Sequence, residues 1–240
     1  MKRNLQMLLI CGMLLIYKCA LADGGQLLYP FSAKYKLSLG GMTLGNVSVS
    51  LDIDTQGNYQ YAAHTVTTGL VAVIRDDEVS EISRGTINRN RVIPQHYSYS
   101  HKKPDQHRQV NLTFQWDKQK VINQTPGSLW SMSITSGVQD KFSQQLALIL
   151  QLNEGEERFE YRVADGGRLK SYTYTNQGSE QITTPAGNFH SIRLTRQKQG
   201  RESKATFWMA PELNYLPVKV IRHEGDDQFH MELVSITWKQ

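Results

Sequence analysis

Residues 35–53 read YKLSLGGMTLGNVSVSLDI. Apolar and polar residues alternate over residues 35–39 and again over residues 47–53, with Gly40 and Gly41 between the two runs. Successive side chains of a strand point to opposite faces, so this alternation gives each strand one apolar and one polar face. A Gly-Gly pair between two such runs is typical of a tight turn. The stretch therefore predicts a β-hairpin with one buried face.

The same alternation recurs along the rest of the chain, with polar turn residues between the runs. Strands are predicted at residues 59–65, 79–87, 97–100, 110–116, 121–122, 159–163, 169–174, 181–184, 189–196, 206–209, 218–222 and 229–238. Many short strands separated by regular turns are typical of antiparallel sandwiches and barrels. The sequence predicts a mainly β protein, built as a curved antiparallel sheet or an open β-barrel.

One segment departs from this pattern. Residues 140–153 read DKFSQQLALILQLN, and Phe142, Leu146 and Ile149 fall on one broad face at helical spacing. Leu, Gln and Ala favour a helix, and Gly155 is suited to end it. Because residues 146–150 are apolar almost all round, we expect a buried helix or a lid on the concave side of the sheet. The alternative is a central strand at residues 146–152.

The N-terminus has the pattern of a secretory signal. Lys2 and Arg3 precede an apolar run at residues 7–17, and the small residues Ala20 and Ala22 suit cleavage after Ala22. The run is far shorter than the roughly 20 apolar residues of a spanning helix. An uncleaved N-terminal anchor is the alternative. No later apolar run reaches membrane length, so we expect no transmembrane segment after cleavage and a single all-β domain over residues 23–240.

Charge and cysteine usage both change when residues 1–22 are removed. Basic residues fall from 27 to 24 against 22 acidic ones, so the net charge falls from +5 to +2. Such a small charge does not indicate a nucleic-acid partner. Both cysteines, Cys11 and Cys19, leave with the signal, which excludes disulfides and Cys-ligated zinc from the mature chain. Export without disulfides favours the periplasm of a bacterium.

Common catalytic and metal-binding motifs are missing from the sequence. It has seven histidines but no HExxH pair, and it has no GxSxG elbow, P-loop or dinucleotide-binding glycine cluster. His223 and His230 flank a predicted hairpin loop and are weak candidates for a metal site, with Glu224 or Asp227. The alternative is a solvated hairpin end, because a metal site needs at least a third ligand. We predict no cofactor and no enzymatic activity, although a triad assembled only in the fold stays open.

Four local patterns together resemble the exported bacterial family known as domain of unknown function 3108. They are PFSAKY at residues 30–35 followed by Gly45, YRVADG at 161–166, TPAGNF at 184–189, and FWMAP at 207–211 leading to YLPV at 215–218. The resemblance spans essentially the whole mature chain and implies an exported β protein without assigning an activity. The last pattern also looks similar to a hairpin of periplasmic lipoprotein-carrier folds, which enclose an apolar cavity.

These observations predict a non-enzymatic envelope protein in the periplasm that binds an apolar or amphipathic ligand such as a lipid. Open barrels commonly hold such ligands in an interior cavity. The candidate lining residues are Trp130, Phe142, Leu146 and Ile149. One alternative is a structural or adaptor protein that binds another envelope protein, and a second is a hydrolase of cell-wall or glycan substrates.

Overall fold

The computed structural model describes residues 28–68, 77–88, 91–198 and 204–239. The predicted signal segment, residues 1–22, lies outside the described residues. One 15-stranded sheet contains every described strand, in the order β8-β7-β6-β5-β4-β3-β2-β1-β15-β14-β13-β12-β11-β10-β9. The sheet is open and antiparallel except for the parallel pair β9 and β10. The predicted fold class, a mainly β curved sheet with one helix, is confirmed.

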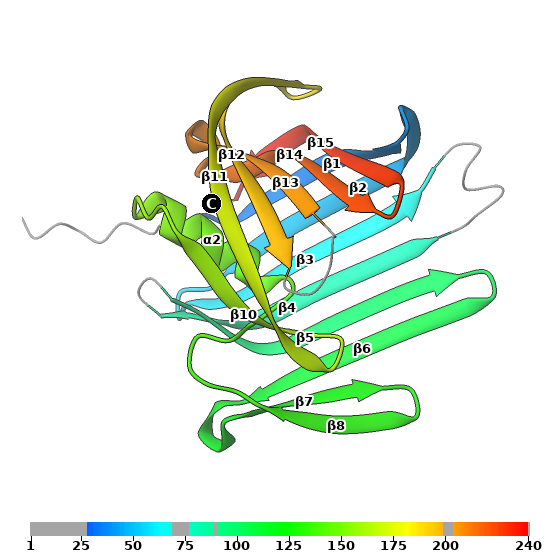
Figure 1. Ribbon diagram of the computed structural model, residues 1–240, viewed down its shortest axis with the longest axis vertical. Coiled ribbons are helices and arrows are strands. Elements are labelled where there is room, and N and C mark those ends of the chain that lie inside the picture. Colours follow the sequence, from blue (N-terminus) through cyan, green and yellow to red (C-terminus); the bar gives the residue numbers. More distant parts are fainter. Residues whose placement is uncertain (1–27, 69–76, 89–90, 199–203, 240) are drawn as a thin grey trace, which may run out of the picture.

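The sheet divides into two wings that meet at β1 (Phe31–Leu39). The N-terminal wing continues through β2 (Met42–Ile53), β3 (Asn58–Thr67), β4 (Glu78–Asn88), β5 (Arg91–Lys103), β6 (Gln106–Gln115), β7 (Lys120–Thr125) and β8 (Ser128–Ser133). The C-terminal wing consists of β9 (Gln139–Asp140), β10 (Phe159–Asp165), β11 (Arg168–Thr184), β12 (Gly187–Lys198), β13 (Lys204–Ala210), β14 (Leu216–Glu224) and β15 (Asp227–Trp238). Figure 1 shows the two wings curling toward each other around a shared concave side.

The predicted hairpin at residues 35–53 is confirmed as β1 and β2. Gly40 and Gly41 have φ angles of +54° and +84°, so both turn positions use a left-handed backbone that glycine adopts without strain. Tyr35, Val47 and Leu51 are buried, as the alternation predicts. The apolar face of this hairpin is therefore part of the core on the concave side.

The helix α2 (Ser143–Asn153) lies between the wings, where it contacts β5 of one and β10 of the other (Figure 1). The predicted helix is confirmed, and the alternative of a strand at residues 146–152 is wrong. Its start is three residues later than predicted because Asp140 belongs to β9. The Asp140 carboxylate accepts hydrogen bonds from the backbone N–H groups of Phe142 and Ser143, at 2.7 Å each. The Ser143 hydroxyl in turn accepts from the Asp140 N–H at 3.0 Å, which completes a reciprocal cap.

Three strand predictions need correction. Residues 169–174 and 181–184 belong to one long strand, β11, whose pairing with β12 shifts register between Asn176 and Ser179. Trp116 lies in a 3-10 turn (Trp116–Lys118), not in the preceding strand. The strand β8 was not predicted, because residues 128–133 are mostly exposed and show no buried apolar alternation.

The proline-rich stretch at residues 205–220 forms a corner between β13 and β14. Pro211 begins a 3-10 turn, and Asn214 and Tyr215 take left-handed φ angles of +51° and +56°. The buried Tyr35 hydroxyl donates to the Pro217 carbonyl oxygen at 3.0 Å, which ties β14 to β1 beyond the neighbouring strand β15. Over the residues that the structure describes, no helix is both long and apolar enough to cross a membrane.

Candidate functional site

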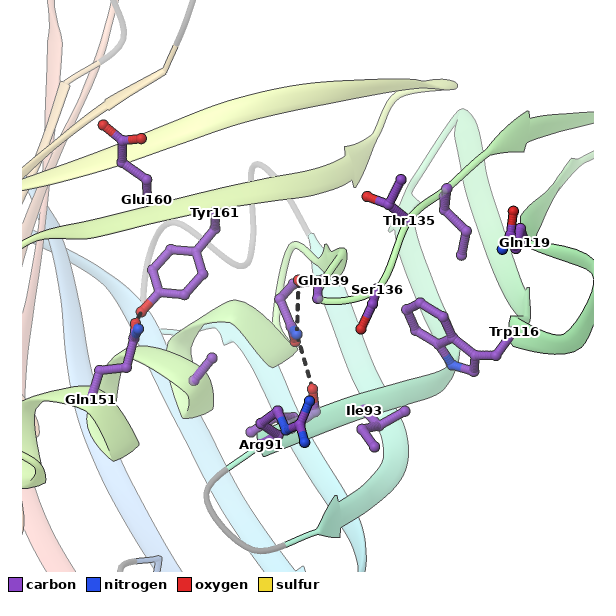
Figure 2. A pocket seen from close by; sticks show the side chains of 14 residues that line it. Arg91, Ile93, Trp116, Gln119, Thr135, Ser136, Gln139, Gln151, Glu160 and Tyr161 are labelled. Atoms are coloured by element: carbon purple, nitrogen blue, oxygen red, sulfur yellow. Dashed lines mark hydrogen bonds between the residues drawn. The ribbon is translucent and has the colours of Figure 1, made fainter.

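A cavity of about 550 Å³ lies beside α2, and we call it the helix cavity. Its walls come from the beginning of β5, the 3-10 turn at Trp116, the segment before β9, the outer face of α2, and β10 (Figure 2). These segments are far apart in the sequence, and the curl of the sheet around the helix brings them together. The helix cavity is therefore a product of the tertiary fold.

Most of the wall is apolar. Val92, Ile93, Trp116 and Ile134 line it on the side of the N-terminal wing, and Ala147 lines it on α2. The Trp116 indole N–H donates to the Pro94 carbonyl oxygen at 2.8 Å, and its ring stacks on Phe114 at 5.4 Å between centroids. Both contacts fix the indole, so it presents a rigid aromatic surface to the cavity.

Polar groups line other parts of the wall. The Gln139 side chain is 4% exposed, and its amide N–H₂ donates to the carbonyl oxygens of Val92 and Gly137 at 2.9 and 3.3 Å. Its carbonyl oxygen, Oε1, is buried and accepts no hydrogen bond from the described residues. Tyr161 donates its hydroxyl to Gln151 of α2, as Figure 2 shows. Burial raises the pKa of Tyr161, so this hydroxyl stays a proton donor at neutral pH.

A buried polar network joins α2 to the N-terminal wing next to this cavity. The Ser83 hydroxyl donates to the second Asp140 oxygen at 2.7 Å and lies 2.9 Å from the Tyr59 hydroxyl. Burial raises the pKa of Asp140 to about 6 despite these donors. No histidine takes part in the network, and every member is buried. We therefore interpret it as a structural anchor of the helix and not as a catalytic triad.

The predicted lining residues lie in two separate places. Phe142, just before α2, and Leu146 and Ile149 on the helix are packed in the core and at most 5% exposed. The Phe142 ring stacks on Tyr61 at 4.0 Å between ring centroids. Trp130 lies away from them on β8, where it is 37% exposed and its indole N–H is 3.4 Å from the Gly167 carbonyl oxygen. None of the four lines the helix cavity.

The side of α2 that faces the helix cavity carries Ala147 and Gln151. Neither residue was predicted from the sequence, and neither were Gln139 and Trp116. One signal was present, because a small and a polar residue four positions apart mark a single face of an otherwise apolar helix. Gln139 had no such signal, since its burial depends on β9 packing against β5.

The two candidate metal-binding histidines lie near the β14–β15 turn. The register pairs His223 with Gln228 and His230 with Ile221, so the histidines are diagonal neighbours and not direct partners. Within the described ranges, no group of three or more His, Cys, Asp or Glu side chains is arranged to hold a metal ion.

Comparisons with known proteins place the chain in a family. The family described as "Protein of unknown function (DUF3108)" matches residues 34–234. The β-barrel-like protein of domain of unknown function DUF1849 from Brucella abortus has a TM-score of 0.61 at 11% identity, covering 89% of this chain and 99% of that one. LprF from Mycobacterium bovis has a TM-score of 0.28 at 11% identity, covering 90% and 86%.

The likeness to the Brucella protein shows a common fold alone, and the score for LprF is too low to carry an argument. No curated protein matches the chain. The family match covers all the strands from β2 to β14 and confirms the resemblance seen in the sequence. The chain belongs to the DUF3108 family of proteins of unknown function.

Proposed function

We propose that this chain is an exported envelope protein that binds an amphipathic molecule in the helix cavity. The observation that carries the proposal is the buried Gln139 Oε1, which has no hydrogen-bond partner among the described residues, on a residue that lines a mostly apolar cavity. Buried polar atoms almost always have a hydrogen-bond partner, so a ligand with a hydroxyl or N–H group fits this position. Its apolar part packs against Trp116, Ile93 and Ile134.

The size of the cavity supports the same conclusion. Small-molecule sites are commonly clefts of roughly 300–1,000 Å³ with a mostly apolar lining and a few placed polar groups. The helix cavity, at about 550 Å³, lies in this range, and its lining is likewise mostly apolar with a few polar groups. Export is supported by the charged start, the short apolar run and the small residues Ala20 and Ala22.

Ala147→Trp tests the proposal, because an indole at this position fills the cavity from the α2 side. The purified mature protein is titrated with a dansyl-labelled fatty acid, with energy transfer from tryptophan as the signal. The matched control is Glu157→Trp, which places the same indole on an exposed position of the loop that follows α2.

We expect Ala147→Trp to weaken probe binding at least about tenfold, since a filled pocket excludes the apolar chain. Glu157→Trp should bind as the wild type does, and both variants should melt cooperatively. Native mass spectrometry of protein purified from the periplasm should show a bound amphipathic molecule that Ala147→Trp lacks. Equal probe binding by a folded Ala147→Trp would show that the cavity is not the site.

A further inference from the structure

A second cavity, of about 690 Å³, opens between the two wings, and we call it the basic cleft. Six of its lining residues are cationic and two are acidic. The cations are Arg108, Lys141, Arg168, Lys170, Lys198 and Arg222, and the acids are Asp165 and Glu224. The basic cleft and the helix cavity share no lining residue. A ligand of the basic cleft is therefore independent of the proposed function.

The acids in and behind the basic cleft neutralise only half of its positive charge. Asp165 accepts from Lys170 at 2.9 Å and also from Lys198, so one carboxylate serves two ammonium groups. Lys141 pairs with Glu81 at 3.7 Å, and Arg222 pairs with Glu224. Counting Glu81, six cations face three acids, which leaves an excess of three positive charges in one cleft.

The charges of the basic cleft are held in place before any ligand arrives. Burial alone would raise the pKa of Asp165, but hydrogen bonds from Lys170 and Lys198 dominate and hold it well below its usual range. The Tyr172 hydroxyl also donates to this carboxylate at 3.1 Å. The carboxylate therefore stays ionised and holds the two ammonium groups side by side at the wall of the cleft.

Two arginines line the cleft from opposite wings. Arg108 is on β6 and Arg168 begins β11, and in the described part of the chain neither has an acidic side chain within ion-pair distance. The Arg108 guanidinium lies 5.9 Å from the centre of the Tyr99 ring, and Lys141 lies 4.9 Å from the same centre. The guanidinium N–H groups of Arg108 and Arg168 are therefore available to a molecule that enters the cleft.

Asn123 is the independent sign of a ligand. Its side chain is 1% exposed and lines the basic cleft, and neither its Nδ2 nor its Oδ1 has a hydrogen-bond partner among the described residues. It occupies one cross-strand row with Tyr97, Leu112 and Trp130, so its side chain points to the concave side. An apolar residue would fit this row without the cost of an unpaired buried amide.

We infer that the basic cleft binds an oxyanion of the phosphate class, with Arg108, Arg168 and Lys198 supplying charge and Asn123 supplying a neutral hydrogen bond. Arginine forks match the geometry of phosphate oxygens, and lysine adds a compact point charge. The Asn123 Nδ2 donates to an oxyanion oxygen, while Oδ1 accepts from a P–OH or a neighbouring hydroxyl. The phosphate is either a free anion or the headgroup of a lipid.

The first test titrates the mature protein with inorganic phosphate by calorimetry. The double variant Arg108→Gln/Arg168→Gln removes two unpaired cations that support no described ion pair. Arg162→Gln is the control, because Arg162 is exposed on β10, the strand that pairs with β11, and does not line the cleft. We expect the double variant to lose at least about tenfold in affinity and the control to lose none, since each charged hydrogen bond contributes strongly.

Asn123→Leu separates binding from folding. An unpaired buried amide costs stability, so we expect this variant to melt at or above the wild-type temperature. Its phosphate affinity should fall about fivefold to tenfold, as for one lost neutral hydrogen bond. A wild-type phosphate affinity in Asn123→Leu, or binding by the double arginine variant equal to that of Arg162→Gln, would overturn the inference. Failure of wild-type protein to bind any phosphate compound would overturn it too.

The source of the phosphate is decided by a comparison of three compounds: inorganic phosphate, decyl phosphate and decanol. Tighter binding of decyl phosphate than of inorganic phosphate, lost in the double arginine variant, identifies a lipid headgroup. Equal binding of the two phosphates identifies a free anion. Decanol binding that Ala147→Trp abolishes reports the helix cavity instead, so failure of one site is distinguishable from failure of the other.

Discussion

Two aspartates on the concave side of the sheet have opposite surroundings. Asp140 is completely buried at the start of α2, and only neutral donors contact its carboxylate. Asp165 lines the basic cleft with an exposed side-chain fraction of 12% and is contacted by two lysines. Burial raises the pKa of Asp140 to about 6, whereas the lysines hold the pKa of Asp165 well below its usual range.

The difference shows that the helix divides one concave surface into two environments. Around Asp140 the hydrogen-bond donors are neutral and every member of the network is buried, so this network, as distinct from the neighbouring helix cavity, supports the fold. Around Asp165, six cations line the basic cleft, and this region is suited to binding an anion. We therefore expect substitutions in the Asp140 network to change stability, and substitutions of the unpaired arginines in the basic cleft to change affinity.

Leu146→Ala should have the largest effect on stability. Leu146 is fully buried on α2, and removing its branched side chain leaves a void between the helix and the sheet. The expected loss is about 2–5 kcal/mol in the free energy of unfolding, measured by urea denaturation. Arg168→Gln, at an exposed position of the cleft, should change the same quantity by less than about 0.5 kcal/mol. Similar losses of unfolding free energy in Leu146→Ala and Arg168→Gln would show that the helix core and the basic cleft do not differ in their contribution to stability.

Asp140→Asn should alter the pH dependence of stability. The folded pKa of about 6 lies above the unfolded value near 4, so the folded state binds the proton more tightly. The contribution of Asp140 to the free energy of unfolding is therefore complete below about pH 4, and it is lost as the pH rises through about 6. Relative to Asp140→Asn, the wild type should lose about 3 kcal/mol across this window. Parallel stability profiles from pH 4 to 7 would contradict the assignment.

Asp165→Asn should have the opposite pH signature. A lowered folded pKa gives stability that is present above the unfolded pKa, near 4, and is lost as the pH falls through the folded value. At neutral pH the substitution leaves Lys170 and Lys198 without their shared carboxylate, and about 1–3 kcal/mol should be lost. This loss should shrink below about pH 4. Urea denaturation over an acidic pH series checks it, and a loss that grows in acid would show that the lysines do not hold the carboxylate ionised.

Trp130→Phe should have the smallest effect. It removes the indole N–H that lies 3.4 Å from the Gly167 carbonyl oxygen and replaces the indole beside this turn with a smaller ring. We expect a loss of no more than about 1 kcal/mol by thermal denaturation. A loss as large as that of Leu146→Ala would mean that the contact between β8 and the β10–β11 turn supports the fold as much as the core does.

Much of the fold was predictable from the sequence because its signals are local. The alternation at residues 35–53 and the glycine pair define a hairpin without reference to the rest of the chain. The helix was predictable from apolar spacing at residues 142–150, although its first residue was not. The start depends on Asp140, which serves both as the end of a parallel strand and as a cap, and that double role exists only in the fold.

The binding surfaces were less predictable because they depend on which face of each element meets the other wing. Phe142, Leu146 and Ile149 were expected to line a ligand site as the most apolar residues of the helix. They pack on the sheet instead, because burying their apolar side chains against the sheet removes them from water. Asn123 and Gln139 carry no pattern of their own, and their importance arises from burial without partners. No count of charges along the chain predicts that six cations from both wings share one cleft.

The position of β1 has a consequence for how this protein assembles. Its residues pair with β2 on one side and with β15 on the other, so the first described strand completes its pairing only with the last one. Apart from the parallel pair β9 and β10, each wing pairs strands that are consecutive in the chain and can form early. The union of the wings requires contacts across nearly the full chain length, and such contacts form slowly. A chain that stops before residue 227 has two half-sheets with an exposed edge along β1. The pairing of β15 with both β1 and β14 is therefore the step that joins the two wings into one sheet.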